Sequence, residues 1–223
     1  MVIAIDGPAG AGKSTVAGKL AQKLNILHLD TGAMYRAAAL YALEQGADPA
    51  DGRAAEALVP QIGVTVEPSA GGQRTFLNGR DVSAAIREHR VSRAASDFSA
   101  HPCVRRKMAA LQREIASALD MVLDGRDIGT YVLPNADFKF FLTADLEERA
   151  RRRASELAQK GCPARYEEVL EDLAQRDKND SSRALAPLKK AEDAIAVDTT
   201  RNSADEIVGQ LAAVIKDEVG RTK

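Results

Sequence analysis

The sequence feature that most constrains this chain is the segment GPAGAGKS, which runs from Gly7 to Ser14. It follows the apolar run MVIAID and precedes a stretch whose apolar residues recur at helical spacing, so a glycine-rich turn joins an expected strand to an expected helix. The segment fits the pattern G-x-x-x-x-G-K-[ST]. Glycines there let successive backbone N–H groups converge on phosphate oxygens, and the helix adds its positive amino-terminal end. The segment therefore predicts a phosphate-binding loop.

The residues of this loop have distinct expected roles. Lys13 should reach the β- and γ-phosphates of a nucleoside triphosphate, Ser14 should coordinate Mg²⁺ through its hydroxyl, and the Thr15 hydroxyl should lie near the α-phosphate. A dinucleotide-binding glycine loop is the alternative, but its glycine spacing differs and it has no role for the Lys-Ser pair. The expected donor-binding set is Gly7, Pro8, Ala9, Gly10, Ala11, Gly12, Lys13, Ser14 and Thr15.

Apolar runs of strand length recur along the chain and alternate with stretches that have apolar residues at three- and four-residue spacing. Continuous apolar strands that alternate with helices indicate a parallel sheet with helices on both faces. We therefore expect an α/β fold with a five-stranded parallel sheet. Expected strands are 1–6, 26–29, 121–123, 138–142 and 194–197, and expected helices are 14–24, 33–43, 104–119, 146–160, 166–176 and 204–219.

One segment interrupts this alternation. Residues 62–67, 74–77 and 81–82 have the composition of short strands, and a Pro- and Gly-containing loop over residues 68–73 and an Asn-Gly turn separate them. This order predicts a small antiparallel meander inserted into the main fold. Farther along, residues 175–183 (QRDKNDSSR) are polar enough to predict a mobile loop.

Composition excludes several other classes of protein. The chain has 223 residues, of which 45% are hydrophobic and 28% are charged, and a chain of this size buries roughly 70% of its unfolded surface. A formal net charge of −1 argues against a nucleic-acid-binding surface. The longest apolar runs are strand-sized and the first residues lack the features of a secretion signal, so we expect a cytoplasmic protein without a membrane segment. Cys103, Cys162 and the three histidines do not have metal-ligand spacing.

Polar segments follow the second and third expected strands, where ligands bind in open α/β sheets. The first is LDTGAMYR, residues 29–36, in which Thr31 or Gly32 is expected to cap a helix. The second is LDGRDIGT, residues 123–130. The chain lacks the N-K-x-D sequence with which a GTPase reads its base. We therefore expect the triphosphate to donate a phosphoryl group to an acceptor that binds at these two segments.

Together these segments resemble the bacterial cytidylate kinases, which are P-loop nucleoside monophosphate kinases. The matching pieces are IDGPAGAGKST, LDTGAMYR, LDGRDIGT and SSRALAPL, in family order over almost the entire chain. The resemblance implies ATP-dependent phosphorylation of CMP and dCMP to the diphosphates, with Mg²⁺. It also implies a single P-loop kinase domain over residues 1–223, with an inserted monophosphate-binding subdomain at about 31–110 and a helical lid at about 156–185.

By this resemblance, a set of residues matches positions that hold the acceptor. Arg36, Arg126 and Arg183 match positions that bind the CMP phosphate, Arg176 and Asp180 match positions near the ribose and the lid, Ser96, Arg105 and Asp127 match positions that read cytosine, and Thr31 and Tyr35 complete the set. Cytosine has an N4 donor beside its N3 and O2 acceptors, so a carboxylate and a cation suit its pocket. Two alternatives stay open: Asp127 forms an ion pair that orients Arg126, and Ser96 lies on a helix surface.

The expected reaction needs charge neutralisation more than proton transfer. The second pKa of a phosphate monoester is about 6, so the attacking oxygen is ionised at neutral pH and no general base is required. Asp124 ends an apolar strand, where it serves either as a second group at the magnesium site or as a loop cap. The expected catalytic residues are Lys13, Arg126, Arg176 and Arg183, together with Mg²⁺.

Helical spacing orients the arginines of the segment ERARRR. Arg149 and Arg153 lie on or beside the apolar face of this expected helix, whereas Arg151 and Arg152 point away from it. Arginines directed inward suggest contact with a ligand. This position lines the ATP site in monophosphate kinases, so the resemblance implies a donor-side role for Arg149 and Arg153. The expected lid departs from the family pattern at Lys178, Asn179, Ser181 and Ser182, where the resemblance leads us to expect more arginine.

Two other functions stay open. One is a kinase for another acceptor such as UMP, AMP or shikimate, against which the GRD segment and the long insert argue. The other is an ATP-binding regulatory module, against which the acceptor-side arginines argue because an ATP sensor needs no second phosphate site. The expected partners are the small-molecule substrates ATP and CMP or dCMP, with no nucleic acid and no membrane, and we expect a monomer.

Overall fold

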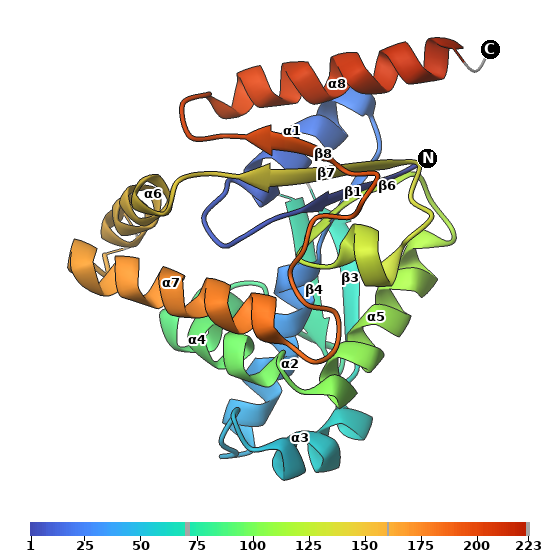
Figure 1. Ribbon diagram of the computed structural model, residues 1–223. Coiled ribbons are helices and arrows are strands. Elements are labelled where there is room, and N and C mark those ends of the chain that lie inside the picture. The colour runs from blue at the N-terminus through green and yellow to red at the C-terminus, as the bar shows by residue number, and fades with distance from the viewer. Residues whose placement is uncertain (70–71, 160, 222–223) are drawn as a thin grey trace.

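A five-stranded parallel sheet forms the centre of the computed structural model, which describes residues 1–69, 72–159 and 161–221 (Figure 1). The strand order is β2-β6-β1-β7-β8, which confirms the predicted parallel sheet. From β1 the chain moves to one side for β2 and to the other side for β7 and β8, so the carboxyl end of β1 is the crevice where ligands bind in such sheets. The strands are β1 (Val2–Asp6), β2 (Leu27–Asp30), β6 (Met121–Gly125), β7 (Phe138–Thr143) and β8 (Ile195–Asp198).

Helices cover both faces of the sheet because successive strand residues point to opposite sides. Ile3 and Ile5 of β1 pack in the apolar cluster formed with α1 and α8, whereas Ala4 packs in the cluster formed with α2 and α5. All three side chains are completely buried. Among the described residues, no helix combines the length and the apolar character that a membrane crossing requires. The covering helices are α1 (Lys13–Leu24), α2 (Thr31–Glu44), α5 (Pro102–Ala116) and α8 (Ala204–Arg221).

A second, antiparallel sheet packs beside α2 and contains β3 (Val64–Ser69), β4 (Gly72–Leu77) and β5 (Arg80–Asp81). The predicted meander is therefore confirmed. Its hairpin is longer than predicted, since the pairing of β3 with β4 continues to the pair formed by Ser69 and Gly72. The prediction of a loop over 68–73 was wrong for its described residues, and residues 70–71 lie outside them. β3 is an edge strand, and an edge strand tolerates the proline that favoured a loop in the sequence.

Two helices of this region were not predicted, namely α3 (Gly52–Leu58) and α4 (His89–Phe98). α4 buries Val91, Ala94, Ala95 and Phe98, whose spacing is that of one helical face. The charged residues between them hid this signal. Three short turns complete the region and the segment after β6: η1 (Val59–Gln61), η2 (Ala85–Arg87) and η3 (Ile128–Val132).

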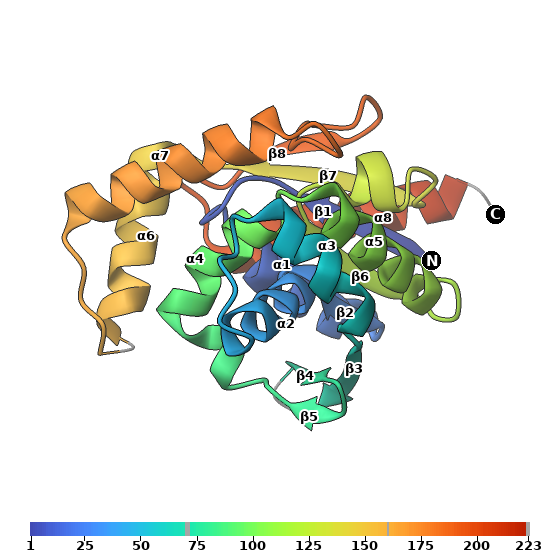
Figure 2. The same cartoon turned by 90° about the horizontal axis from the view of Figure 1, so that it is seen from below.

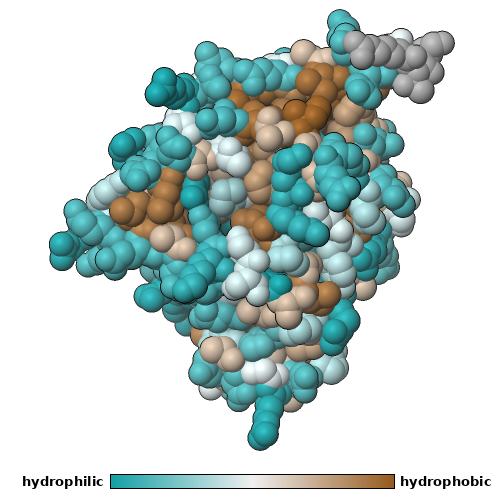
Figure 3. Space-filling view, viewed as in Figure 1, coloured by the Kyte–Doolittle hydropathy of each residue, from teal (hydrophilic) through white to brown (hydrophobic). Residues whose placement is uncertain are grey.

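The helices α6 (Leu146–Gln159) and α7 (Tyr166–Ser182) lie side by side at the end of the sheet toward which β7 points (Figures 1 and 2). They form a small apolar cluster of their own, in which Ala9 is the member from the glycine-rich loop. Figure 3 shows apolar surface at this side of the molecule, bordered by hydrophilic residues.

The prediction of a mobile loop over residues 175–183 was wrong, because residues 175–182 form the last turns of α7. Polar side chains support the helix here in place of apolar ones. Gln175 donates a hydrogen bond to Asn179 one turn later, at 2.7 Å, and Asp180 is buried against arginines from elsewhere in the chain.

Candidate functional site

The loop over residues 7–12 turns tightly between β1 and α1. Gly7 has φ +148°, and a Cβ there would lie 2.0 Å from the carbonyl oxygen of Leu142, so only glycine fits. Lys13 begins α1 and is almost completely buried, and its Nζ donates a hydrogen bond to the carbonyl oxygen of Pro8 at 2.7 Å. Burial lowers the pKa of Lys13, and Arg126 lowers it further. The loop therefore places a buried cation over its own backbone, as a polyphosphate site requires.

The carboxyl end of β6 supplies a second group to this loop. Asp124 is buried, and its Oδ2 accepts a hydrogen bond from the Ser14 hydroxyl at 2.6 Å. Its Oδ1 lies 2.7 Å from Nε2 of His28 on β2, a contact that the sequence did not reveal. Hydroxyl and carboxylate oxygens are ligands that Mg²⁺ prefers, so Ser14 and Asp124 fit a magnesium ion. Within the described ranges, no group of three or more His, Cys, Asp or Glu side chains is placed to hold a metal ion.

The segment after β2 begins α2 differently from the prediction. Asp30 caps the helix, because its Oδ1 accepts a hydrogen bond from the backbone N–H of Ala33 at 2.9 Å. The expectation that Thr31 or Gly32 is the cap was wrong. The Thr31 hydroxyl instead donates to the carbonyl oxygen of Asp124 at 2.7 Å, so it joins the ends of β2 and β6. Arg36 forms an ion pair with the other oxygen of Asp30, at 2.8 Å.

Three of the predicted acceptor residues gather around the buried carboxylate of Asp180. Arg126 donates to it from Nε at 2.8 Å, and Arg183 forms a second ion pair with it. Burial alone would raise the pKa of Asp180, but Arg126, Arg183 and Arg176 hold it below its ordinary value. Burial lowers the pKa of Arg176 to about 10, with a further contribution from Arg126. The cluster therefore places three arginines around one buried carboxylate, an arrangement that favours the binding of an anion.

Two of the three residues matched to the cytosine-reading positions, Arg105 and Asp127, lie together in the interior. The side chains of Arg105 and Asp127 form an ion pair at 2.5 Å and are 1% and 4% exposed. The guanidinium carbon of Arg105 lies 5.4 Å from the ring centre of Tyr35. In the described part of the chain, the Tyr35 hydroxyl and Nε of Arg105 are buried without a hydrogen-bond partner. Buried polar groups are rarely left unpaired, so these orphaned atoms mark a place for a ligand.

This pairing removes one alternative left open by the sequence. Asp127 pairs with Arg105, whereas Arg126 pairs with Asp180, so Asp127 is not the counter-ion that orients Arg126. Ser99, which the sequence did not indicate, joins the two groups. Its carbonyl oxygen accepts from Arg105 at 3.3 Å and its hydroxyl accepts from Arg183 at 3.1 Å.

A polar cavity of about 170 Å³ lies between α4 and α7. Ser96, Arg153 and Arg176 line it together, so three predicted site residues from distant parts of the chain meet there. Ser96 is half-buried on α4, which leaves both of its suggested roles possible.

Comparison with known proteins identifies the family. The family model described as "Cytidylate kinase" matches residues 3–217 of the chain. The chain belongs to the cytidylate kinase family. It is 51% identical to a cytidylate kinase from Shouchella clausii over 96% of each chain, and 48% identical to one from Halalkalibacterium halodurans over 98% of this chain and 99% of that one. A crystal structure of an uncharacterized protein from Eubacterium ventriosum matches 97% of this chain and 98% of its own with a TM-score of 0.52 and 14% identity, which shows a similar fold.

In this member of the cytidylate kinase family, the arginines of α6 differ from the predicted pattern. Arg149 is buried as predicted and donates to the carbonyl oxygens of Ala9 at 3.0 Å and Ala144 at 2.9 Å. Its guanidinium also pairs with Asp177 of α7 at 2.7 Å. Arg149 therefore connects the glycine-rich loop to both helices.

Arg153 is half-buried and pairs with Glu156, while Arg151 is exposed as predicted. The contacts of Arg152 were not predicted. Arg152 donates to the carbonyl oxygens of Thr199 at 2.6 Å and Thr200 at 3.3 Å, because α6 also rests on the segment after β8. A single apolar face could not indicate this second, polar contact of the helix.

Asp6 is another functional candidate that the sequence did not indicate. It ends β1, and its carboxylate accepts hydrogen bonds from the backbone N–H groups of Ile128 at 2.8 Å and Gly129 at 2.7 Å. Burial raises the pKa of Asp6 to about 6. The residue therefore fixes the turn that presents Arg126 and Asp127 relative to the strand that enters the glycine-rich loop.

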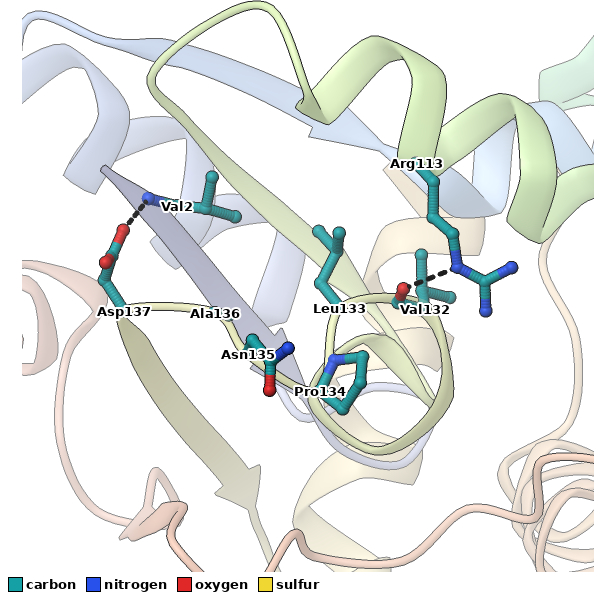
Figure 4. A pocket seen from close by; sticks show the side chains of 8 residues that line it. All are labelled: Val2, Arg113, Val132, Leu133, Pro134, Asn135, Ala136 and Asp137. Atoms are coloured by element: carbon teal, nitrogen blue, oxygen red, sulfur yellow. Dashed lines mark hydrogen bonds between the residues drawn. The ribbon is translucent and has the colours of Figure 1, made fainter.

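A larger cavity of about 420 Å³ contains none of the predicted site residues (Figure 4). Val2, Arg113 and the segment 132–137 line it, and Val2 is the first residue of β1. It therefore lies at the amino-terminal end of the sheet, opposite to the glycine-rich loop.

Proposed function

We propose that this protein transfers the γ-phosphoryl group of ATP to CMP and dCMP, giving CDP and dCDP together with ADP. Family membership supports the activity, and one observation supports the transfer step. Asp6, which precedes the glycine-rich loop, pairs in register with Gly125, which precedes Arg126 of the acceptor cluster, in the neighbouring strands β1 and β6. The two anion-binding groups therefore meet at the carboxyl ends of β1 and β6, where two phosphates would be brought together.

The donor side would hold ATP through the backbone of residues 7–12, Lys13 and the hydroxyls of Ser14 and Thr15. Ser14 and Asp124 would hold Mg²⁺, which supplies charge neutralisation between the β- and γ-phosphates when it is bound. Arg149 would support this side by holding the loop at Ala9, since its donor groups already bind backbone carbonyls. Arg153 lines the polar cavity and pairs with Glu156. It would exchange this ion pair for a contact with a phosphate of ATP.

The acceptor side would bind the CMP phosphate through Arg36, Arg126 and Arg183. In the structure aspartates pair with all three guanidinium groups and orient them. The CMP phosphate would displace a carboxylate when it binds. Asp180, once displaced, would be free to accept a hydrogen bond from the ribose, near Arg176. Thr31 would act indirectly, since its hydroxyl is committed to the main chain.

The cytosine base would bind at Arg105, Asp127 and Ser96. The orphaned Nε of Arg105 is a donor for the acceptor atoms of the base, and Asp127 is an acceptor for its N4 amino group. Burial raises the pKa of Tyr35, so its hydroxyl stays protonated and can donate. A uracil base presents an acceptor where cytosine presents N4, so this pocket disfavours UMP.

The reaction would proceed without a general base, because the attacking phosphate oxygen is already ionised. Lys13, Arg126, Arg176 and Arg183 would neutralise the charge that accumulates between the two nucleotides. Burial of these cations strengthens each interaction with the transferring group.

We further propose that residues at about 31–110 form the monophosphate-binding subdomain and that residues at about 156–185 form the lid. α7 and the last residues of α6 lie within the proposed lid, and their apolar residues belong to a cluster outside the two main clusters of the sheet. Closure would exclude water as a competing acceptor. We also propose that the protein acts as a cytoplasmic monomer, and sedimentation would check its size.

The test is an ADP-release assay with magnesium, ATP and, in parallel, CMP, dCMP, UMP, AMP or no acceptor. We expect ADP production that depends on CMP and dCMP. Faster turnover of UMP or AMP would retain the fold and the transfer step but reject Ser96, Arg105 and Asp127 as a cytosine site. ADP production with none of these acceptors would favour an ATP-binding regulatory module.

A further inference from the structure

His28 is the one histidine among the described residues that contacts the proposed magnesium site, and the proposed reaction gives it no role. It lies on β2, with its Nε2 2.7 Å from Oδ1 of Asp124. The other oxygen of that carboxylate accepts the Ser14 hydroxyl at 2.6 Å. The side chain of Asp124 is 5% exposed and that of His28 is 19% exposed. Both oxygens of a buried carboxylate therefore have fixed and different partners.

The polarity of this contact follows from its chemistry. An ionised carboxylate only accepts hydrogen bonds, so Nε2 of His28 donates. The opposite edge of the ring faces α1, where a Cβ on Gly18 would lie 3.5 Å from Nδ1. Gly18 is one helical turn after Ser14, so the ring fills the space between α1 and the end of β6. The imidazole therefore lies between Gly18 of α1 and the carboxylate of Asp124.

A carboxylate at a metal site must present one oxygen in one direction, and residues behind it usually set that direction. Here His28 occupies Oδ1, which leaves Oδ2 directed at the Ser14 hydroxyl. We propose that His28 is a positioning residue that orients Asp124 toward magnesium and so couples magnesium binding to ATP binding. This inference rests on the proposed magnesium site of Ser14 and Asp124. A purely structural role, in which His28 only satisfies a buried acceptor, predicts lost stability without lost magnesium coupling.

The test compares ATP binding by calorimetry with magnesium and with EDTA, in the full chain. His28→Leu removes the donor, and His28→Gln returns an amide nitrogen to the position of Nε2. We expect His28→Leu to weaken ATP binding about tenfold in magnesium and to leave binding in EDTA unchanged, because second partners of metal ligands contribute about 10–100-fold to metal affinity. His28→Gln should recover most of this loss.

His101→Leu is the matched control. This variant also removes a histidine donor, since Nε2 of His101 donates to the carbonyl oxygen of Pro49 at 2.9 Å. His101, however, has no hydrogen bond to Ser14 or Asp124 among the described contacts. The variant should leave the ratio of the two ATP affinities unchanged. If His28→Leu does not fold, His28→Asn replaces it, because the shorter amide places its nitrogen at the Nδ1 position and does not reach Asp124.

Asp124→Asn and Ser14→Ala distinguish the role of His28 from the magnesium site itself. The magnesium effect is the ratio of the ATP affinity in magnesium to that in EDTA. If Asp124→Asn and Ser14→Ala lose this effect while His28→Leu and His28→Asn retain it, the role of His28 is overturned and the magnesium site stands. If Asp124→Asn and Ser14→Ala also retain the full magnesium effect, the magnesium site itself is wrong. A loss in His28→Asn that His28→Gln does not share would support orientation by the Nε2 donor.

Discussion

The donor side and the acceptor side of the proposed site are built in different ways. The donor side is one continuous segment, residues 7–15, whose backbone forms the loop and whose Lys13 folds back on Pro8. The acceptor side draws its arginines from distant parts of the chain, and aspartates or a serine hold Arg36, Arg105, Arg126 and Arg183. A phosphate site made of backbone tolerates distant changes, whereas a site made of paired charges depends on every partner.

The largest effect is expected when Lys13→Ala breaks the donor side. Loss of a buried cation at the transferring phosphate should lower kcat/KM about 1000-fold, as measured by ADP release. The protein should remain folded, because burial already disfavours the charged form of Lys13. Lys19→Ala, on the exposed face of the same helix, should keep wild-type activity. Substantial activity in Lys13→Ala would show that the acceptor arginines alone stabilise the transfer.

The next effect concerns the interior of the acceptor side. Asp127→Asn leaves Arg105 as a buried charge without its counter-ion, so we expect a loss of about 3 kcal/mol in the free energy of unfolding. Urea denaturation would measure it. Asp81→Asn, at an exposed ion pair with Arg74, provides the control and should change little. If Asp127→Asn folds, it should also lose the preference for CMP over UMP. An unchanged preference would exclude Asp127 from the base pocket.

Arg126→Ala tests whether the two sides bind their ligands separately. We expect CMP binding to weaken about 100-fold, because a charge-assisted phosphate contact is lost, while ATP binding stays within about twofold. Calorimetry with each nucleotide alone would measure both. Arg151→Ala removes an exposed arginine that pairs with Glu148 and should change neither affinity. Equal losses for the two nucleotides would contradict the division into two sites.

The smallest effect is a pH dependence of stability at Asp6, which links the end of β1 to the turn after β6. Burial raises the pKa of Asp6 from the ordinary 3.8 to about 6. A carboxyl with a raised pKa in the folded state stabilises the fold when protonated, so this stability is present below about pH 4 and is lost as the pH rises through about 6. Relative to Asp6→Asn, the wild type should lose about 2 kcal/mol between about pH 4 and about pH 6 in urea denaturation. Parallel curves for the two proteins would show that Asp6 does not titrate in this range.

Local signals in the sequence were sufficient for the parallel sheet, the glycine-rich loop and most helices of the main fold. Apolar runs such as residues 1–6 become strands because both faces of a parallel sheet are buried, and the loop needs only its own glycines. Where partners came from distant segments, the local signals misled. Residues 175–182 are polar yet helical because Asp180 is neutralised by arginines such as Arg126, 54 residues away.

The sequence by itself determined the fold class, the donor loop and, through its resemblance to a family, the residues expected at the acceptor. Tertiary structure alone decided how those residues are held. It paired Arg105 with Asp127 and set Asp30 as the cap and the partner of Arg36. It also brought His28 to Asp124 and Asp6 to the turn after β6. The physical reason is range: hydrogen-bonded turns and apolar periodicity act between near neighbours in the chain, whereas the partner of a buried charge is set by the packing of the whole chain.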